Sequence, residues 1–255
     1  MFDVVVVLAY WRPDYIARCL ECLTEAKAHQ KIWVFQDDRI DLPKDKRDAH
    51  SLTRDIISQN SDKWDRFIQR VPHDFTTHGQ DGLHCCSYNS FWGLREAYEF
   101  GSNLTYLVAD DVLVTPDFFK WHEAVHKDDT WFSSVAERPF KQFQWWDNPF
   151  NLSAYYMSPT ILMDGGMCWP RRSLKTVLRY PMTEVRDHRF NYDGIFPVIP
   201  AVQRAYHVGR KSSYLYGDGV CGDTDSDPIT MPVYEWDSVY FDENFEEPPC
   251  QPTAK

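Results

Sequence analysis

Short apolar runs alternate with longer amphipathic stretches along the first half of the chain. Val4–Leu8 and Lys31–Phe35 are rich in β-branched and aromatic residues and too short for helices, which is typical of strands buried on both faces. Between these runs, apolar residues recur at helical spacing from about Pro13 to Ala28. The pattern therefore predicts a β-α-β unit with parallel strands.

The alternation continues toward residue 180. Thr115, Pro116 and Asp117 predict a helix start, with Thr115 as the N-cap and Pro116 at the first helical position. Strands that alternate with helices predict an α/β fold with a mostly parallel central sheet, which binds ligands at the carboxyl ends of its strands. The other elements expected are helices at His50–Gln59, Gly82–Phe100 and Arg172–Arg179, and strands at Arg66–Val71 and Leu104–Ala109.

The regular alternation of apolar runs and amphipathic stretches ends after Ala136. Phe140–Tyr156 is dense in Phe, Trp and Tyr without a clear period, which predicts a loop or flap over a cleft. Residues 217–255 are acidic, contain several prolines and lack periodicity. We expect a domain at residues 1–216, followed by an acidic C-terminal extension that packs on the surface or is partly mobile.

Composition and charge exclude several classes of protein. With 255 residues and 43% hydrophobic content, the chain is large enough for a substantial core. The net charge of −11 argues against a protein that coats nucleic acid or anionic membranes indiscriminately. The segment from Arg171 to Lys211, however, carries nine basic and three acidic side chains, which favours one surface that faces an anion.

The seven cysteines are an odd number, which fits a reducing compartment better than a disulfide framework. Cys19 and Cys22 share helical spacing with neighbouring apolar residues, so we expect two core thiols in place of a zinc site. The apolar run Val4–Ala9 is far shorter than the ~20 residues of a membrane span. We therefore expect a cytoplasmic protein without a membrane anchor.

Two acidic pairs each follow an apolar run: Asp37 and Asp38, and Asp110 and Asp111. In a parallel sheet both pairs reach the same carboxyl edge, where four carboxylates repel one another unless they bind a divalent cation or polar donors such as sugar hydroxyls. The alternative is structural, because turns after strands favour Asp for backbone hydrogen bonds. The glycine-rich phosphate loops, the G-x-S-x-G elbow and the H-E-x-x-H zinc motif are absent from the sequence.

The assembled pattern resembles GT-A-type glycosyltransferases from the first run to about Gly209. The opening run through Tyr10 and Arg12 is similar to that of family 2 enzymes, and the segment from Tyr106 to Phe119 resembles the metal-binding strand of the N-acetylglucosaminyltransferase I family. Ala109 stands where those relatives have a first acid. The resemblance implies a GT-A fold with a nucleotide-binding half at about residues 1–111 and an acceptor-binding half at residues 112–216.

The resemblance also implies roles for particular residues. It implies Mn²⁺ or Mg²⁺ held by Asp111, His207 and Asp110. Asp193 is the expected catalytic base and Asp187 the second candidate, although the Trp that flanks this motif in the relatives is missing. Arg12, with Asp37 or Asp38, is expected to hold the nucleoside of the donor. The expected donor-binding residues are Tyr10, Arg12, Asp37, Asp38, Asp110, Arg210 and Lys211. The expected acceptor-binding residues are Trp145, Trp146, Trp169 and Gly166.

The function implied is metal-dependent transfer of a sugar from a nucleotide sugar, with a UDP-sugar expected, to an acceptor hydroxyl with inversion. The acceptor is either a saccharide or other small molecule, or a hydroxymethylated base of phage DNA. Two alternatives stay open: a catalytically inert GT-A-like protein that binds metal or nucleotide, and a nucleotidyltransferase. The missing glycine-rich loop after the first strand argues against the second alternative.

Overall fold

The computed structural model describes residues 2–38, 44–70, 82–127, 132–136, 155–157, 166–179, 198–200 and 204–207. The helices in this part of the chain are α1 (Pro13–Ala26), α2 (Lys44–Gln59), α3 (Gly82–Glu99), α4 (Phe118–Val125) and α5 (Arg171–Val177). The strands are β1 (Val4–Ala9), β2 (Lys31–Asp37), β3 (Arg66–Arg70), β4 (Leu104–Ala109), β5 (Val112–Val114), β6 (Ser134–Val135), β7 (Tyr155–Met157), β8 (Met167–Pro170), β9 (Val198–Pro200) and β10 (Ala205–His207).

One mixed sheet dominates the described structure, with the strand order β3-β2-β1-β4-β8-β6-β9-β7. β1, β2, β3 and β4 are parallel, and β8 continues the sheet antiparallel to β4. β5 and β10 form a separate antiparallel pair. The predicted fold class, a mostly parallel mixed sheet flanked by helices, is confirmed.

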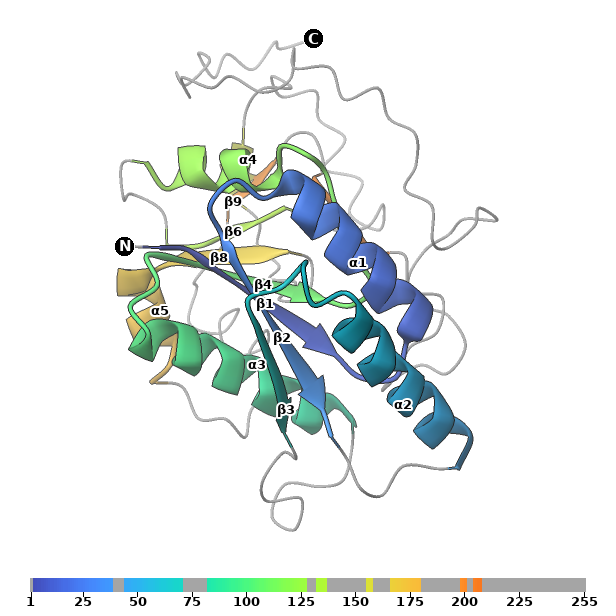
Figure 1. Ribbon diagram of the computed structural model, residues 1–255. Coiled ribbons are helices and arrows are strands. Elements are labelled where there is room, and N and C mark those ends of the chain that lie inside the picture. Colours follow the sequence, from blue (N-terminus) through green and yellow to red (C-terminus); the bar gives the residue numbers. More distant parts are fainter. Residues whose placement is uncertain are drawn as a thin grey trace, which may run out of the picture.

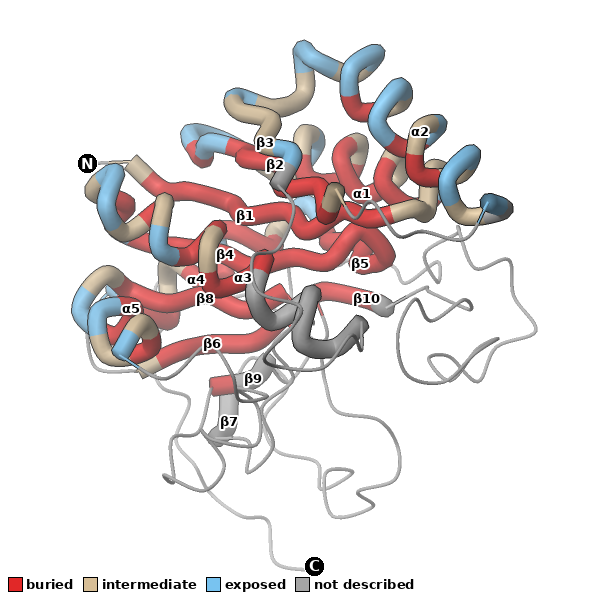
Figure 2. The backbone as a smooth tube through the Cα atoms, turned by 90° about the horizontal axis from the view of Figure 1, so that it is seen from below, coloured by how far each residue is buried: buried red, intermediate tan, exposed pale blue. Residues whose placement is uncertain are grey.

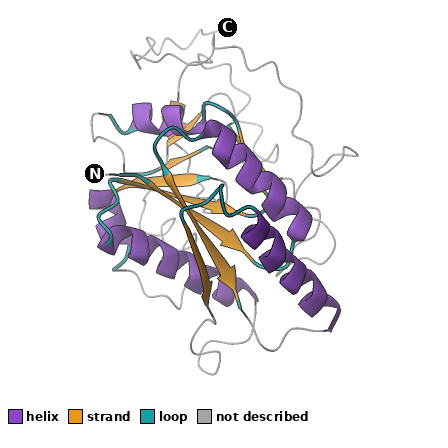
Figure 3. Cartoon of the chain, viewed as in Figure 1, coloured by secondary structure: helices purple, strands orange, loops and turns teal. Residues whose placement is uncertain are grey.

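Helices cover both faces of the sheet (Figure 1, Figure 3). Val5 and Val7 of β1 belong to a core cluster that includes side chains of α1, α2 and α4, whereas Val4 and Val6 belong to a cluster with side chains of α3 and α5. This alternation explains why every residue of β1 is buried, as Figure 2 shows for the central strands. The continuous apolar runs of the sequence are therefore the doubly covered centre of the sheet.

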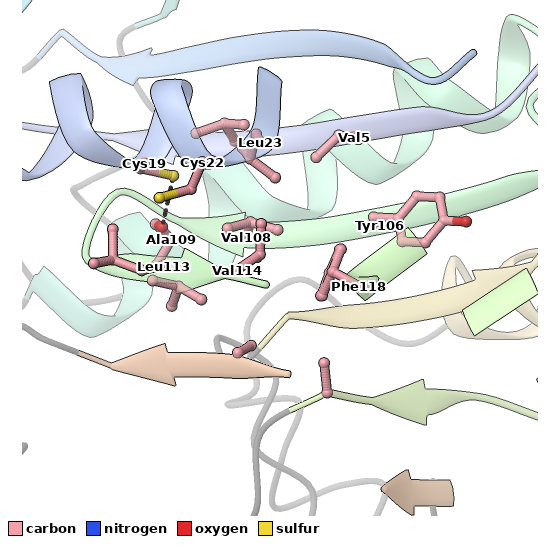
Figure 4. Packing of buried hydrophobic residues seen from close by; sticks show 14 of the residues in the cluster. Val5, Cys19, Cys22, Leu23, Tyr106, Val108, Ala109, Leu113, Val114 and Phe118 are labelled. Atoms are coloured by element: carbon pink, nitrogen blue, oxygen red, sulfur yellow. Dashed lines mark hydrogen bonds between the residues drawn. The ribbon is translucent and has the colours of Figure 1, made fainter. Parts of the chain in front are cut away.

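The thiols of α1 lie in the first of these clusters. Cys19 and Cys22 are free and buried, and the Cys19 thiol donates a hydrogen bond to the Ala109 carbonyl at 3.6 Å (Figure 4). Burial raises the pKa of Cys19 well above its ordinary value, so the thiol stays protonated. The prediction of two core thiols is confirmed.

Several predicted elements begin or end elsewhere. α2 begins at Lys44 and not at His50, and α4 begins at Phe118, so Thr115 is not its N-cap. The Thr115 hydroxyl donates to Asp117 at 2.5 Å and the Phe118 N–H donates to the Thr115 carbonyl, which forms a turn before the helix. The first two residues of β7 belong to the predicted loop at Phe140–Tyr156, and the rest of that loop lies outside the described residues.

None of the helices in the described ranges combines the length and the apolar character needed to cross a membrane. The predicted C-terminal extension and the boundary at residue 216 lie outside the described residues.

Candidate functional site

The candidate site lies at the carboxyl ends of the parallel strands. Asp37 is the last residue of β2, while Asp110 and Asp111 form the turn between β4 and β5; all three are buried. β10 pairs with β5 so that His207 is opposite Val112, which places its backbone beside the residue that follows Asp111. The structure therefore brings the two predicted acidic pairs to one edge of the sheet and aligns the predicted metal-binding segments.

Arg12 occupies the centre of this site. Its Nη1 donates to Oδ2 of Asp111 at 2.5 Å, and its Nη2 donates to Oδ1 of Asp110. The ion pairs are shielded from solvent, because the side chains of Arg12, Asp110 and Asp111 are 10%, 2% and 12% exposed. The sequence analysis predicted that Arg12 binds the nucleoside together with Asp37 or Asp38. In the structure, Arg12 forms ion pairs with Asp110 and Asp111 of the acidic turn.

Burial and the neighbouring charges shift the pKa values of Asp110 and Arg12. Burial is the main cause that raises the pKa of Asp110 to about 6; the Asp111 charge also raises it and Arg12 opposes the shift. Burial lowers the pKa of Arg12, but the two carboxylates outweigh it and hold the pKa above its ordinary value. Arg12 is thus always charged, and one cation balances two acids at neutral pH.

A buried polar network holds the neighbouring loop in place. The Gln36 amide donates to the carbonyls of Tyr10 and His50 at 3.0 and 3.1 Å, and Gln69 donates to the Gln36 Oε1 at 3.0 Å. A ring nitrogen of His50 lies 2.7 Å from the Asp37 carbonyl. These contacts fix the end of β2 against the loop after β1.

Sequence reasoning missed Gln36, His50 and Gln69 as supports of the site. Only Gln36 has a recognisable sequence signal, because it is a polar residue directly after an apolar run. His50 was one of nine scattered histidines. Its role depends on packing between α2 and β2, which no local pattern reports.

Trp169 and Gly166 do not line an open surface. Trp169 is fully buried in the core cluster with α3 and α5, so its predicted role in stacking the acceptor is wrong: it packs the sheet against the helices. Gly166 has a φ of +73°, and a Cβ there would lie 2.8 Å from Phe118 and 3.1 Å from Ala205. The close approach of neighbouring elements explains this glycine.

Other predicted residues cannot be placed. The predicted Asp187, Asp193, Arg210, Lys211, Trp145 and Trp146 lie outside the described residues, as does the side chain of His207. Asp38 is described and is partly exposed, with one carboxylate oxygen 3.9 Å from the His50 ring. Its predicted role on the donor therefore stays a prediction.

The acidic turn fits a divalent cation in its chemistry. Carboxylate oxygens are the ligands that Mg²⁺ and Mn²⁺ prefer, and the turn already attracts the positive charge of Arg12. Asp111 is the more exposed of its two acids and so the more accessible to an ion. An ion on Asp111 would compete with Arg12 for this carboxylate.

No protein-family model matches the chain, and no curated protein matches its sequence.

Solved structures do resemble this chain. The S. aureus protein TarS 1-349, solved in complex with UDP-GlcNAc, matches with a TM-score of 0.57 at 14% identity, over 84% of this chain and 60% of that one. The mannosyltransferase PcManGT from Pyrobaculum calidifontis, in complex with GDP-Man and Mn²⁺, matches with a TM-score of 0.51 at 15% identity, over 79% of this chain and 54% of that one. This chain spans no more than about three fifths of either solved chain. The shared arrangement of sheet and helices is the GT-A glycosyltransferase fold.

Proposed function

We propose that this protein is a metal-dependent glycosyltransferase that moves a sugar from a nucleotide sugar, a UDP-sugar, to an acceptor hydroxyl with inversion. The observation that supports this most is the acidic turn of Asp110 and Asp111 at the carboxyl edge of a GT-A fold, paired with Arg12. Two similar structures are complexes with nucleotide sugars, and one of these also contains Mn²⁺.

The donor's nucleoside would lie over the end of β2. Asp37 and Asp38 follow the apolar run of β2, and carboxylates accept hydrogen bonds from ribose hydroxyls and from base N–H groups. Tyr10 lies on the adjacent loop, where Gln36 fixes its carbonyl. This arrangement supports a rigid nucleoside site that needs no glycine-rich phosphate loop.

The donor's diphosphate is an anion and needs positive charge at an acidic edge. Asp111, with Asp110 and His207, would hold a Mn²⁺ or Mg²⁺ ion. Bound there, the ion supplies Lewis-acid stabilisation of the charge that develops on the nucleoside diphosphate. Arg12, once released from Asp111, carries a further positive charge at the same place, and we assign the same role to Arg210 and Lys211.

The acceptor hydroxyl must lose a proton as it attacks the anomeric carbon. We assign this step to Asp193 as general base, with Asp187 as the second candidate. The acceptor that we propose is a saccharide or other small molecule, contacted by Trp145 and Trp146. An Asp193→Asn variant should bind the donor as the unchanged protein does and should transfer no sugar; an active variant would remove this assignment.

The test of the function is hydrolysis and transfer with a panel of UDP- and GDP-sugars in the presence of Mn²⁺. We expect turnover with at least one donor and its loss in Asp111→Asn. Asp55→Asn on α2 is the matched control, since Asp55 is an exposed carboxylate outside the site. Silence with every donor in a protein that binds Mn²⁺ would favour the catalytically inert alternative.

A further inference from the structure

A second group of metal-ligating side chains lies at the opposite edge of the sheet. Asp3 directly precedes β1, His29 lies in the loop between α1 and β2, and Glu123 is in α4. The six residues of β1 lie between this group and the acidic turn. At the rise of an extended strand they span ~20 Å, which is the separation of the two sites. The group therefore has no part in donor binding.

The ligand atoms of these three residues converge. Oδ2 of Asp3 lies 3.2 Å from Nε2 of His29, which lies 3.8 Å from Oε1 of Glu123. All three atoms lie within 4.8 Å of one another. Ligand atoms around one tetrahedral zinc ion are about 3.3 Å apart, so small rotations of the side chains suffice to bring them to one ion.

Hydrogen bonds already orient the two carboxylates. The other oxygen of Asp3, Oδ1, accepts the backbone N–H of Leu104 at 3.0 Å, which leaves Oδ2 directed to His29. The Gln30 amide donates to Oε1 of Glu123 at 2.6 Å, and its own oxygen accepts the backbone N–H groups of Ala28 and His29. Contacts of this kind are the outer shell that fixes ligands around protein-bound metals.

The charges at this edge also favour a cation. Asp3 is buried and Glu123 is partly buried, so the two neighbouring carboxylates are only partly hydrated. Burial, and after it the Asp3 charge, raise the pKa of Glu123, which His29, Gln30 and Lys120 oppose. His29 is 57% exposed, so an ion can reach its ring from solvent.

We propose that Asp3, His29 and Glu123 bind a divalent transition-metal ion of the zinc class. One imidazole nitrogen and two carboxylate oxygens match the donor set of Zn²⁺, with water at the remaining position. The ion joins the start of β1, the loop before β2 and α4, three segments that are far apart in the sequence. Its role is to stabilise this edge of the fold.

The test is calorimetric titration of the nucleotide-free protein with Zn²⁺, together with thermal unfolding with and without the ion. We expect a binding event that raises the unfolding temperature and that is lost in His29→Gln and in Glu123→Gln. Loss of the orienting amide in Gln30→Leu should weaken binding by about 10–100-fold. His29 is largely exposed, so its replacement leaves the fold intact.

Asp111→Asn separates this site from the proposed donor site. That variant should retain the zinc event, and the titration contains no nucleotide, so its outcome is independent of any glycosyl transfer. Equal zinc affinity and stoichiometry in the unchanged protein and in His29→Gln would overturn the proposal. Absence of zinc binding in Asp111→Asn would overturn it as well.

Discussion

Arg12 offers the sharpest perturbation of the candidate site. Replacing it in Arg12→Gln leaves the buried carboxylates of Asp110 and Asp111 without the cation that now pairs with both. Removing one partner of a buried ion pair typically costs about 3–5 kcal/mol of stability. We expect a loss of that size at pH 7 to 8, measured by urea unfolding.

The pH dependence of this loss follows from Asp110. The pKa of Asp110 is raised from 3.8 to about 6 in the folded protein, so the folded state binds this proton more tightly than the unfolded state does. The resulting gain in the free energy of unfolding is complete below pH 3.8 and is lost as the pH rises through about 6. The slope in this window is about 1.4 kcal/mol per pH unit for a single proton. Without Arg12 the pKa of Asp110 rises further, so the window extends to higher pH and the difference between the two proteins shrinks toward pH 4.

The same substitution tests the competition between Arg12 and a metal ion. Because Arg12 and the ion would compete for the same carboxylate of Asp111, Arg12→Gln should bind Mn²⁺ more tightly, and Mn²⁺ should restore part of its stability. Arg95→Gln is the matched control: its ion pair with Glu99 is exposed and should contribute less than about 1 kcal/mol. Equal stability, equal pH profile and equal Mn²⁺ affinity for Arg12→Gln and the unchanged protein would refute this reasoning.

Two further predictions concern the core. In Gly93→Ala the new Cβ would lie 2.3 Å from Cγ1 of Val6, so we expect a loss of about 1–3 kcal/mol in urea unfolding, and an unchanged midpoint would show that α3 can shift. Ser134→Ala removes the hydroxyl that lies 2.6 and 2.8 Å from ring nitrogens of two buried histidines of the α4 segment, so we expect a loss of about 1–3 kcal/mol. Ser133→Ala is its control, since the Ser133 hydroxyl has no hydrogen-bond partner among the described residues; equal effects of the two would contradict the account.

The parallel half of the fold was predictable because its evidence is local. β1 is an unbroken apolar run, β4 is apolar except for Thr105, and α1 begins at Pro13 as the pattern predicts. β6 and β9 have two and three residues, too few for any periodicity, and they exist because β8 and its neighbours pair with them. Short strands of this kind are a property of the assembled sheet and not of their own sequence.

The candidate site divides in the same way. The acidic pairs were visible because each follows a strand, and the parallel sheet then brings them to one edge. The partners of Arg12 are 98 and 99 residues away, so no local pattern identifies them. Trp169 was assigned to a surface from its resemblance to a motif, whereas tertiary packing places it in the core.

The most direct test of the central claim is calorimetric titration of the protein with UDP, with and without Mn²⁺. The account predicts that Mn²⁺ strengthens UDP binding, that Asp111→Asn abolishes this effect, and that Asp55→Asn behaves as the unchanged protein does. The same enhancement in Asp111→Asn as in the unchanged protein would contradict the account, as would a protein that binds no nucleoside diphosphate under either condition.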